Sequence, residues 1–272
     1  MLYKLYLWMV ILTFSIYKLT GSTKHMIPSG GSLETPSLEH FLGTDDLGID
    51  IFAQICHGGG SSLIIGAASA ALAVSIGVGV GVLSGYIGGK ADAVLMGICD
   101  IVTSMPQMIL LILMGAFLGS SYITLVIVLA LMSWTHTARI IRARVLFIKS
   151  ENYIRYSENI GASVWNILIK HFLPSLKELL GLSFIKIMSR SIVMEASLAY
   201  LGISNPISKS WGMMLNRAMS FSGIFYTPFW KWWVLSPLIA LVGLILSLML
   251  LGREKEGYII RSNRSVRNEK NS

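Results

Sequence analysis

The chain has 272 residues, of which 54% belong to the hydrophobic set and only 13% are charged, where a soluble domain carries about 25% charged residues. This composition excludes a soluble globular protein, because several apolar runs approach the roughly 20 residues needed to cross a bilayer. The net charge of +8 does not indicate nucleic-acid binding, since the basic residues cluster in segments that flank apolar runs. Cys56 and Cys99 stand in different environments and support neither a disulfide framework nor a metal site.

Six apolar segments predict six membrane-spanning helices, because a backbone in lipid must satisfy its own hydrogen bonds. They cover residues 3–20, 62–87, 92–118, 121–137, 179–203 and 230–251. The first segment also resembles a signal peptide, with Lys4 before an apolar stretch from Leu5 to Tyr17. We favour a retained span, because no A-x-A-like cleavage site follows it. The predicted fold class is an all-α, polytopic membrane protein.

The second segment carries a small residue at every fourth position. The row consists of Ser69, Ala73, Gly77, Gly81 and Gly85. Four residues slightly exceed one helical turn, so the row forms a shallow stripe against which another helix can lie closely. We predict helix packing at Gly77, Gly81 and Gly85. The alternative is that glycine is simply common in membrane helices, as Gly79 off the stripe illustrates.

The basic residues predict the orientation. The connector after the fourth segment carries Arg139, Arg142, Arg144, Lys149, Arg155, Lys170 and Lys177, and the tail from residue 253 to 272 is also basic. Residues 21–60 carry Lys24 alone against five carboxylates. By the positive-inside rule, the connector and both termini are expected to be cytoplasmic. The acidic stretch from Gly43 to Asp50 lacks the ligand spacing of a calcium loop, so we expect an ordered turn on the outer face.

Residues 150–174 of the connector predict a short helix, a break at Gly161 and a second amphipathic helix that ends at Leu173-Pro174. A cytoplasmic helical element of this kind can dock into a partner protein. The alternative is an interfacial helix on the lipid surface, which the apolar residues between Trp165 and Phe172 would also suit.

Five groups of motifs occur together and in order. They are FLGTDDLGID at 41–50, SGYIGG at 84–89, Asp100 with Met105-Pro106, the stretch 153–174, and EASLAYLG at 195–202 followed by SWGMM at 210–214. From about residue 41 to 220 the chain resembles permease subunits of the dipeptide, oligopeptide and nickel class of ABC importers, in the branch of the second permease of each pair. The resemblance implies a type I, MetI-like permease core over residues 61–252. A first span with an external segment precedes it at 1–60, and a basic cytoplasmic tail follows at 253–272.

The resemblance also implies that the connector is a coupling region that sits in a groove of a cytoplasmic ATPase subunit. The family pattern is Glu-Ala-Ala, three residues, Gly, and a helix ending in Leu-Pro. Arg155, Tyr156 and Ser157 replace the triplet, so the groove of the usual ATPase should be mismatched unless it has changed in step. A second departure is Ile49, where the family commonly has Arg. The expected coupling residues are Tyr153, Arg155, Tyr156, Ser157, Gly161, Ala162, Leu173 and Pro174.

Four charged residues fall inside predicted spans: Asp100 in the third, and Lys186, Arg190 and Glu195 in the fifth. Each costs about 2.5 to 3.5 kcal/mol at the centre of a span, so it should face protein or water. One hypothesis places Asp100, Arg190 and Glu195 along the translocation path, at the interface with the companion permease. The alternative is structural: Lys186 snorkels to the boundary, Asp100 bonds a neighbouring helix, and Glu195 lies near the outer end.

The chain contains no G-x-x-x-x-G-K-[ST] phosphate loop, so ATP is expected to bind to partner subunits. We expect no cofactor, metal site or catalytic residue in this subunit. The implied partners are a companion permease, two cytoplasmic ATPase subunits, an extracytoplasmic substrate-binding protein and membrane lipid in a bacterial cell membrane, with no nucleic acid. The cargo stays open between dipeptides, longer peptides, nickel and metallophore chelates.

Two other functional classes compete with this interpretation. A self-contained secondary transporter or channel should show internal repeats with broken or charged spans in corresponding halves, and we find no such repeat. A membrane-embedded enzyme would need a nucleophile, base or ligand cluster on adjoining spans. The five histidines offer none, because His25, His40, His57, His136 and His171 are scattered without i, i+4 pairing.

Overall fold

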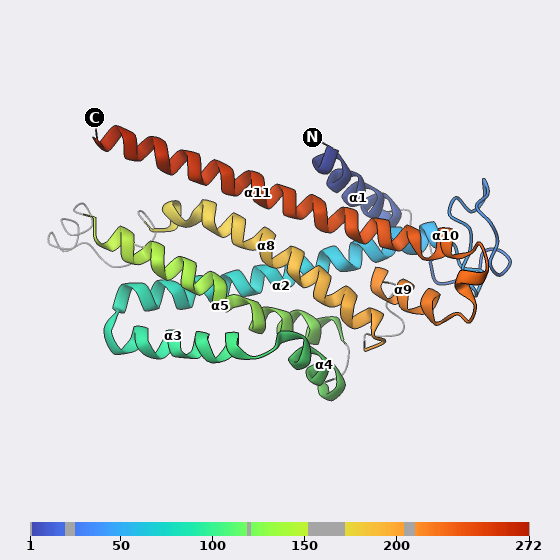
Figure 1. Ribbon diagram of the computed structural model, residues 1–272, viewed down its shortest axis with the longest axis horizontal. Coiled ribbons are helices and arrows are strands. Elements are labelled where there is room, and N and C mark those ends of the chain that lie inside the picture. The colour runs from blue at the N-terminus through green and yellow to red at the C-terminus, as the bar shows by residue number, and fades with distance from the viewer. Residues whose placement is uncertain (1, 20–24, 119–120, 152–171, 204–209, 272) are drawn as a thin grey trace.

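The computed structural model describes residues 2–19, 25–118, 121–151, 172–203 and 210–271. Figure 1 shows long helices that run side by side along one axis. In chain order they are α1 (Leu2–Leu19), α2 (Ile51–Ile87), α3 (Gly89–Ser104), α4 (Gln107–Leu118), α5 (Tyr122–Lys149), α8 (Leu173–Tyr200), α9 (Trp211–Ser220), α10 (Trp230–Trp233) and α11 (Leu235–Asn271), with a 3-10 turn at Ile224–Tyr226. Within these ranges the β structure is limited to one bridge between Thr44 and Asp50. The predicted all-α fold class is confirmed.

Helices α2 and α5 lie in direct contact along the small-residue stripe. A Cβ atom placed on Gly81 would lie 2.6 Å from the backbone oxygen of Ala138 in α5. At Gly77 and Gly85 the nearest atoms of α5 would be 2.7 and 2.8 Å away. Gly79, off the stripe, has nothing within 4 Å of the same position. The stripe therefore lets the backbones of two helices approach more closely than any side chain would permit.

Helix α8 packs against both α2 and α11. Ile192 of α8 contacts α2 at Gly66, where an added Cβ would lie 2.7 Å from its Cγ1 atom. The same side chain belongs to a buried cluster that includes Leu244 and Leu248 of α11. Trp211 of α9 joins this cluster and donates its indole N–H to the backbone oxygen of Ile55, at 2.9 Å. These contacts fix the rotation of α8, and with it the direction of its charged residues.

The six predicted spans correspond in order to α1, α2, the α3–α4 pair, α5, α8 and α11. Within the described part of the chain, three helices are long and apolar enough to cross a membrane: α2, α5 and the segment from Trp230 to Tyr258. The α3–α4 pair meets the same measure but is bent by 82°. Helix α1 has a shorter apolar stretch, Tyr3–Ser15. The protein is a multi-pass membrane protein. Helix α8 is less apolar than the helices above because it carries the charged residues Lys186, Arg190 and Glu195.

The third predicted span, residues 92–118, is not one continuous helix. Met105, between α3 and α4, has an extended backbone with φ −80° and ψ 133°. Pro106 explains the break, because proline lacks an N–H donor and disfavours the helical conformation of the residue before it. The predicted limits of four other spans also change. Helix α2 begins at Ile51 instead of 62, and α5 continues to Lys149 instead of ending near 137. Helix α8 begins at Leu173 instead of 179, and α11 continues to Asn271 instead of ending near 251.

The two ends of the bundle differ in composition. Residues 25–50, α9 and α10 gather at one end, on the right of Figure 1. The α2–α3 turn, the end of α5, the start of α8 and the end of α11 lie toward the other end. The acidic segment and the basic helix ends are thus separated along the long axis.

Candidate functional site

An open cavity with several polar side chains lies where the α3–α4 break meets α5 and α8. Its volume is about 620 Å³, within the range of about 300 to 1,000 Å³ typical of ligand pockets. Its charged and strongly polar lining comes from Gln107 of α4, His136 and Arg139 of α5, and Lys186 and Arg190 of α8. The cavity therefore collects cationic side chains from two helices.

The break between α3 and α4 shapes one wall of this cavity. Met105 and Pro106, the residues at the break, are both part of the lining. The side-chain amide of Gln107 donates a hydrogen bond to the backbone oxygen of Met132 in α5, at 2.8 Å. This bond ties the start of α4 to α5. Irregular backbone within a membrane-spanning segment is tolerated where it lines a cavity, and Met105 and Pro106 line this one.

Asp100 lies beside the cavity and not in its lining. Its carboxylate accepts a hydrogen bond from the Arg139 guanidinium at 2.7 Å, and its side chain is 72% exposed. The sequence placed Arg139 in the connector, whereas the structure places it in α5 and makes it a wall of the cavity. The signal that could have revealed this is the spacing of Thr135 and Arg139, which are four residues apart and so share a helix face.

Glu195 faces a different part of the bundle. It is 1% exposed, and one carboxylate oxygen accepts a hydrogen bond from the hydroxyl of Ser62 in α2, at 3.2 Å. Among the three residues of the path hypothesis, Arg190 lines the cavity, Asp100 pairs with a residue of its wall, and Glu195 does neither. The hydrogen bond from Ser62 favours a structural role for Glu195 over a role in the translocation path.

The start of α8 is anchored among the ends of α2 and α5. Phe172 and Leu176 are buried in a cluster with Ile141 and Val145 of α5, and the ring of Tyr86 packs edge-on against Phe172. The connector therefore re-enters the bundle at a well-packed point.

Most predicted coupling residues lie outside the described ranges. These are Tyr153, Arg155, Tyr156, Ser157, Gly161 and Ala162. Leu173 and Pro174 form the first positions of α8. Proline is favoured there, because the first helical N–H groups have no partner within the helix.

An ion pair joins α3 and α5 near the same end. The guanidinium of Arg142 donates to both carboxylate oxygens of Asp92, at 2.5 and 2.6 Å. The hydroxyl of Ser84 in α2 also donates to this carboxylate. Lys149 adds a bond of 2.6 Å from its ammonium to the backbone oxygen of Tyr86. These contacts tie three helices together close to the connector.

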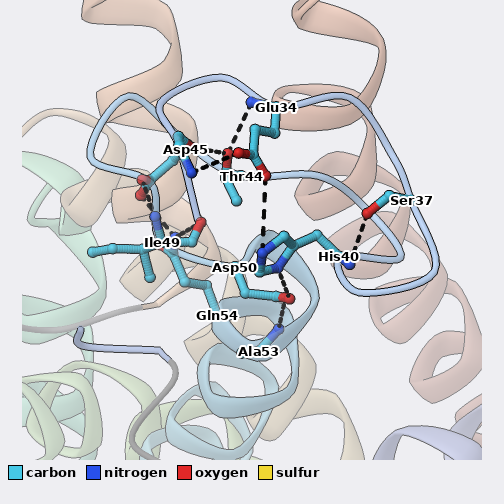
Figure 2. A network of polar contacts seen from close by, with 10 residues as sticks. Glu34, Ser37, His40, Thr44, Asp45, Ile49, Asp50, Ala53 and Gln54 are labelled. Atoms are coloured by element: carbon cyan, nitrogen blue, oxygen red, sulfur yellow. Dashed lines mark hydrogen bonds and ion pairs between the residues drawn. The ribbon is translucent and has the colours of Figure 1, made fainter. Parts of the chain in front are cut away.

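At the opposite end, Asp50 holds the start of α2 (Figure 2). One oxygen of its carboxylate accepts the backbone N–H of Ala53 at 2.9 Å, which caps the helix. The other lies 2.8 Å from Nδ1 of His40. Asp50, Ala53 and His40 are all buried, so the segment that precedes α2 is fixed to the start of the helix.

Asp45 organises the turn that precedes α2 (Figure 2). One of its carboxylate oxygens accepts the backbone N–H groups of Leu47 and Ile49, each at 2.9 Å. The other accepts the side-chain amide of Gln54 at 2.8 Å. Ile49 is 3% exposed, so an apolar side chain suits this position. The turn from 43 to 50 is ordered through carboxylate bonds within the chain. Across the described residues, no group of three His, Cys, Asp or Glu side chains is placed to hold a metal ion.

Comparison with known proteins identifies the family. Residues 77–253 match the model of the binding-protein-dependent transport system inner membrane component. The chain belongs to this family. Its members are transport components and not enzymes, and the predicted ABC importer permease is thereby confirmed.

Several relatives carry more specific names. A protein of Brucella suis named as a peptide permease is 35% identical over 218 residues, which is 80% of this chain and 71% of the relative. The oligopeptide transport system permease protein OppC of Bacillus subtilis is 34% identical over 68% of this chain and 61% of its own. The glutathione transport system permease protein GsiD of Pectobacterium atrosepticum is 36% identical over 69% of this chain and 62% of its own.

Proposed function

We propose that this permease imports peptides or peptide-like compounds such as glutathione. The observation that carries the proposal is the similarity to relatives named for peptide, oligopeptide and glutathione transport, over two thirds or more of the chain. Nickel and metal chelates, which the resemblance also left open, find no support among these relatives. The selection between peptides would rest largely with the external binding protein.

The permease would work with a companion permease, two cytoplasmic ATPase subunits and an extracytoplasmic binding protein. The family description, binding-protein-dependent transport, supports the last of these directly. ATP would bind to the ATPase subunits, since this chain has no phosphate loop. The chain itself would carry no cofactor.

The connector and both termini would face the cytoplasm of a bacterial cell. Two observations support this orientation: the basic residues flank the same ends of the helices, and the acidic segment lies at the opposite end of the bundle. Residues 150–174 would then contact the ATPase. Movement of this segment would reach α8 and α5 through the buried cluster around Phe172.

The test is uptake by a reconstituted complex. The chain is affinity-tagged, purified with its associated subunits and placed in proteoliposomes with the binding protein. We expect an ATPase to co-purify and labelled peptide to accumulate only with ATP. An Ala162→Cys variant should cross-link to the ATPase. Uptake without any ATPase would refute the proposal and favour a self-contained secondary transporter.

A further inference from the structure

The cavity beside α8 is unbalanced in charge. Arg139, Lys186 and Arg190 line it together with His136. The described residues of its lining include no carboxylate. A cavity of this composition has a positive potential, which favours an anionic group over a neutral or cationic one.

Two of the three cations have partners in the chain. Arg139 is paired with Asp100 at 2.7 Å, and Lys186 lies 3.2 Å from a carboxylate oxygen of Glu256 in α11. Arg190 also borders the neighbouring groove between α8 and α11, where Glu256 lies. In the part of the chain that the structure describes, Arg190 makes no ion pair or hydrogen bond. One positive charge therefore remains unmatched.

The position of Arg190 within the fifth predicted span makes an unpaired charge unfavourable in free energy. Arg190 stands ten residues before Tyr200, the last residue of α8, which corresponds to about 15 Å along a helix. From Leu173, the first residue, the distance is about 25 Å by the same measure. A guanidinium this far from both helix ends is rarely found without an anion or a water-filled cavity to face.

We infer that the cavity binds a carboxylate of the transported peptide, with Arg190 as the principal contact. The planar guanidinium matches the two oxygens of a carboxylate in a bidentate pair. Arg139 and Lys186 line the same space, but each is already paired with a carboxylate of the chain, so Arg190 holds the unpaired charge. A peptide with a free C-terminus always supplies such a group. This inference rests on the proposed function, because it names the part of the cargo that this cavity recognises.

The experiment uses the complete reconstituted complex and two labelled probes, tri-alanine with a free C-terminal carboxylate and tri-alanine amide. Uptake of each probe by Arg190→Gln and Arg190→Lys is divided by uptake in the unaltered complex. This ratio cancels any preference of the binding protein, which is the same in every sample. Arg253→Gln is the matched control, because Arg253 is an exposed arginine of α11 that lines the neighbouring groove and not the cavity.

We expect Arg190→Gln to lower uptake of the free acid about tenfold or more, since it removes a charge-assisted hydrogen bond. Arg190→Lys should keep most of this uptake, and uptake of the amide should change little. The control should behave as the unaltered complex. Co-purification of the companion permease and ATPase with each variant checks assembly.

Two results would overturn the inference. Unchanged free-acid uptake in Arg190→Gln would show that the cavity does not recognise the carboxylate. An equal loss for both probes would show that Arg190 acts on transport without recognising the C-terminal carboxylate. Neither result touches the proposed function, which fails only if the unaltered complex takes up no peptide.

Discussion

Gly81→Ala tests the direct contact between α2 and α5. The added Cβ would lie 2.6 Å from the backbone oxygen of Ala138 and 2.8 Å from Cβ of Ile141. Both neighbours belong to the rigid part of α5, so no flexible side chain can move aside. The two helices must separate by several tenths of an ångström, which loosens the close contacts at Gly77 and Gly85 as well. Overpacking of this kind costs about 1 to 3 kcal/mol.

The measurement is the unfolding temperature of the purified protein in detergent. A change of 1 kcal/mol shifts Tm by about 2 to 4 °C for a chain of 150 to 250 residues, so Gly81→Ala should lower Tm by roughly 2 to 12 °C. The matched control is Gly79→Ala on the same helix. Its Cβ would meet nothing within 4 Å, and alanine is the better helix former by about 1 kcal/mol. Equal unfolding temperatures for the two variants would show that α5 does not rest on the backbone of α2.

Three further predictions concern two polar contacts and one glycine turn at the two ends of the bundle. Asp92→Asn should lower the free energy of unfolding by about 1 kcal/mol, because the ion pair with Arg142 is partly exposed and so is weaker than a buried one. In a double-mutant cycle with Arg142→Gln, measured by thermal unfolding, the coupling energy should also be about 1 kcal/mol. Additive effects of the two substitutions would contradict the ion pair. Asp50→Ala removes a helix cap and the partner of His40, so amide hydrogen exchange in the first turn of α2 should accelerate about fivefold or more. Asp50→Asn keeps a capping oxygen and should show a smaller change. Equal exchange rates in the two variants would count against the cap. Gly48 has φ +75°, and an added Cβ would lie 2.3 Å from a backbone oxygen; Gly48→Ala should therefore speed proteolysis within residues 25–50, and an unchanged digestion pattern would mean that this turn is not fixed.

Local patterns in the sequence were sufficient to predict the main helices of the bundle. Apolar runs located the long helices of the bundle but not their ends, because a backbone in lipid has few alternatives to a helix. The four-residue spacing of Gly77, Gly81 and Gly85 indicated a packing stripe, and in the structure these glycines lie against α5. Charge patterning separated the two ends of the bundle, and the ordered motifs identified the family.

The helix boundaries were less predictable. The fourth span was expected to end near residue 137, because Arg139 and the basic residues after it resemble a loop. In the structure the helix continues to Lys149, since Arg139 and Arg142 are paired with carboxylates of α3. A basic residue that is paired with a carboxylate on another helix can lie within its own helix and does not mark that helix's end. The local sequence does not show which carboxylate will be the partner.

The sequence by itself determined that this chain is a bundle of membrane helices, which end is basic, and which charges lie within the spans. Only the tertiary structure decided that Arg139 and Arg190 share one cavity, while Glu195 turns away to Ser62 in α2. The physical reason is that hydropathy and spacing are properties of one helix. The side chains that meet depend on the rotation and depth of several helices, which are set by packing between residues far apart in the chain.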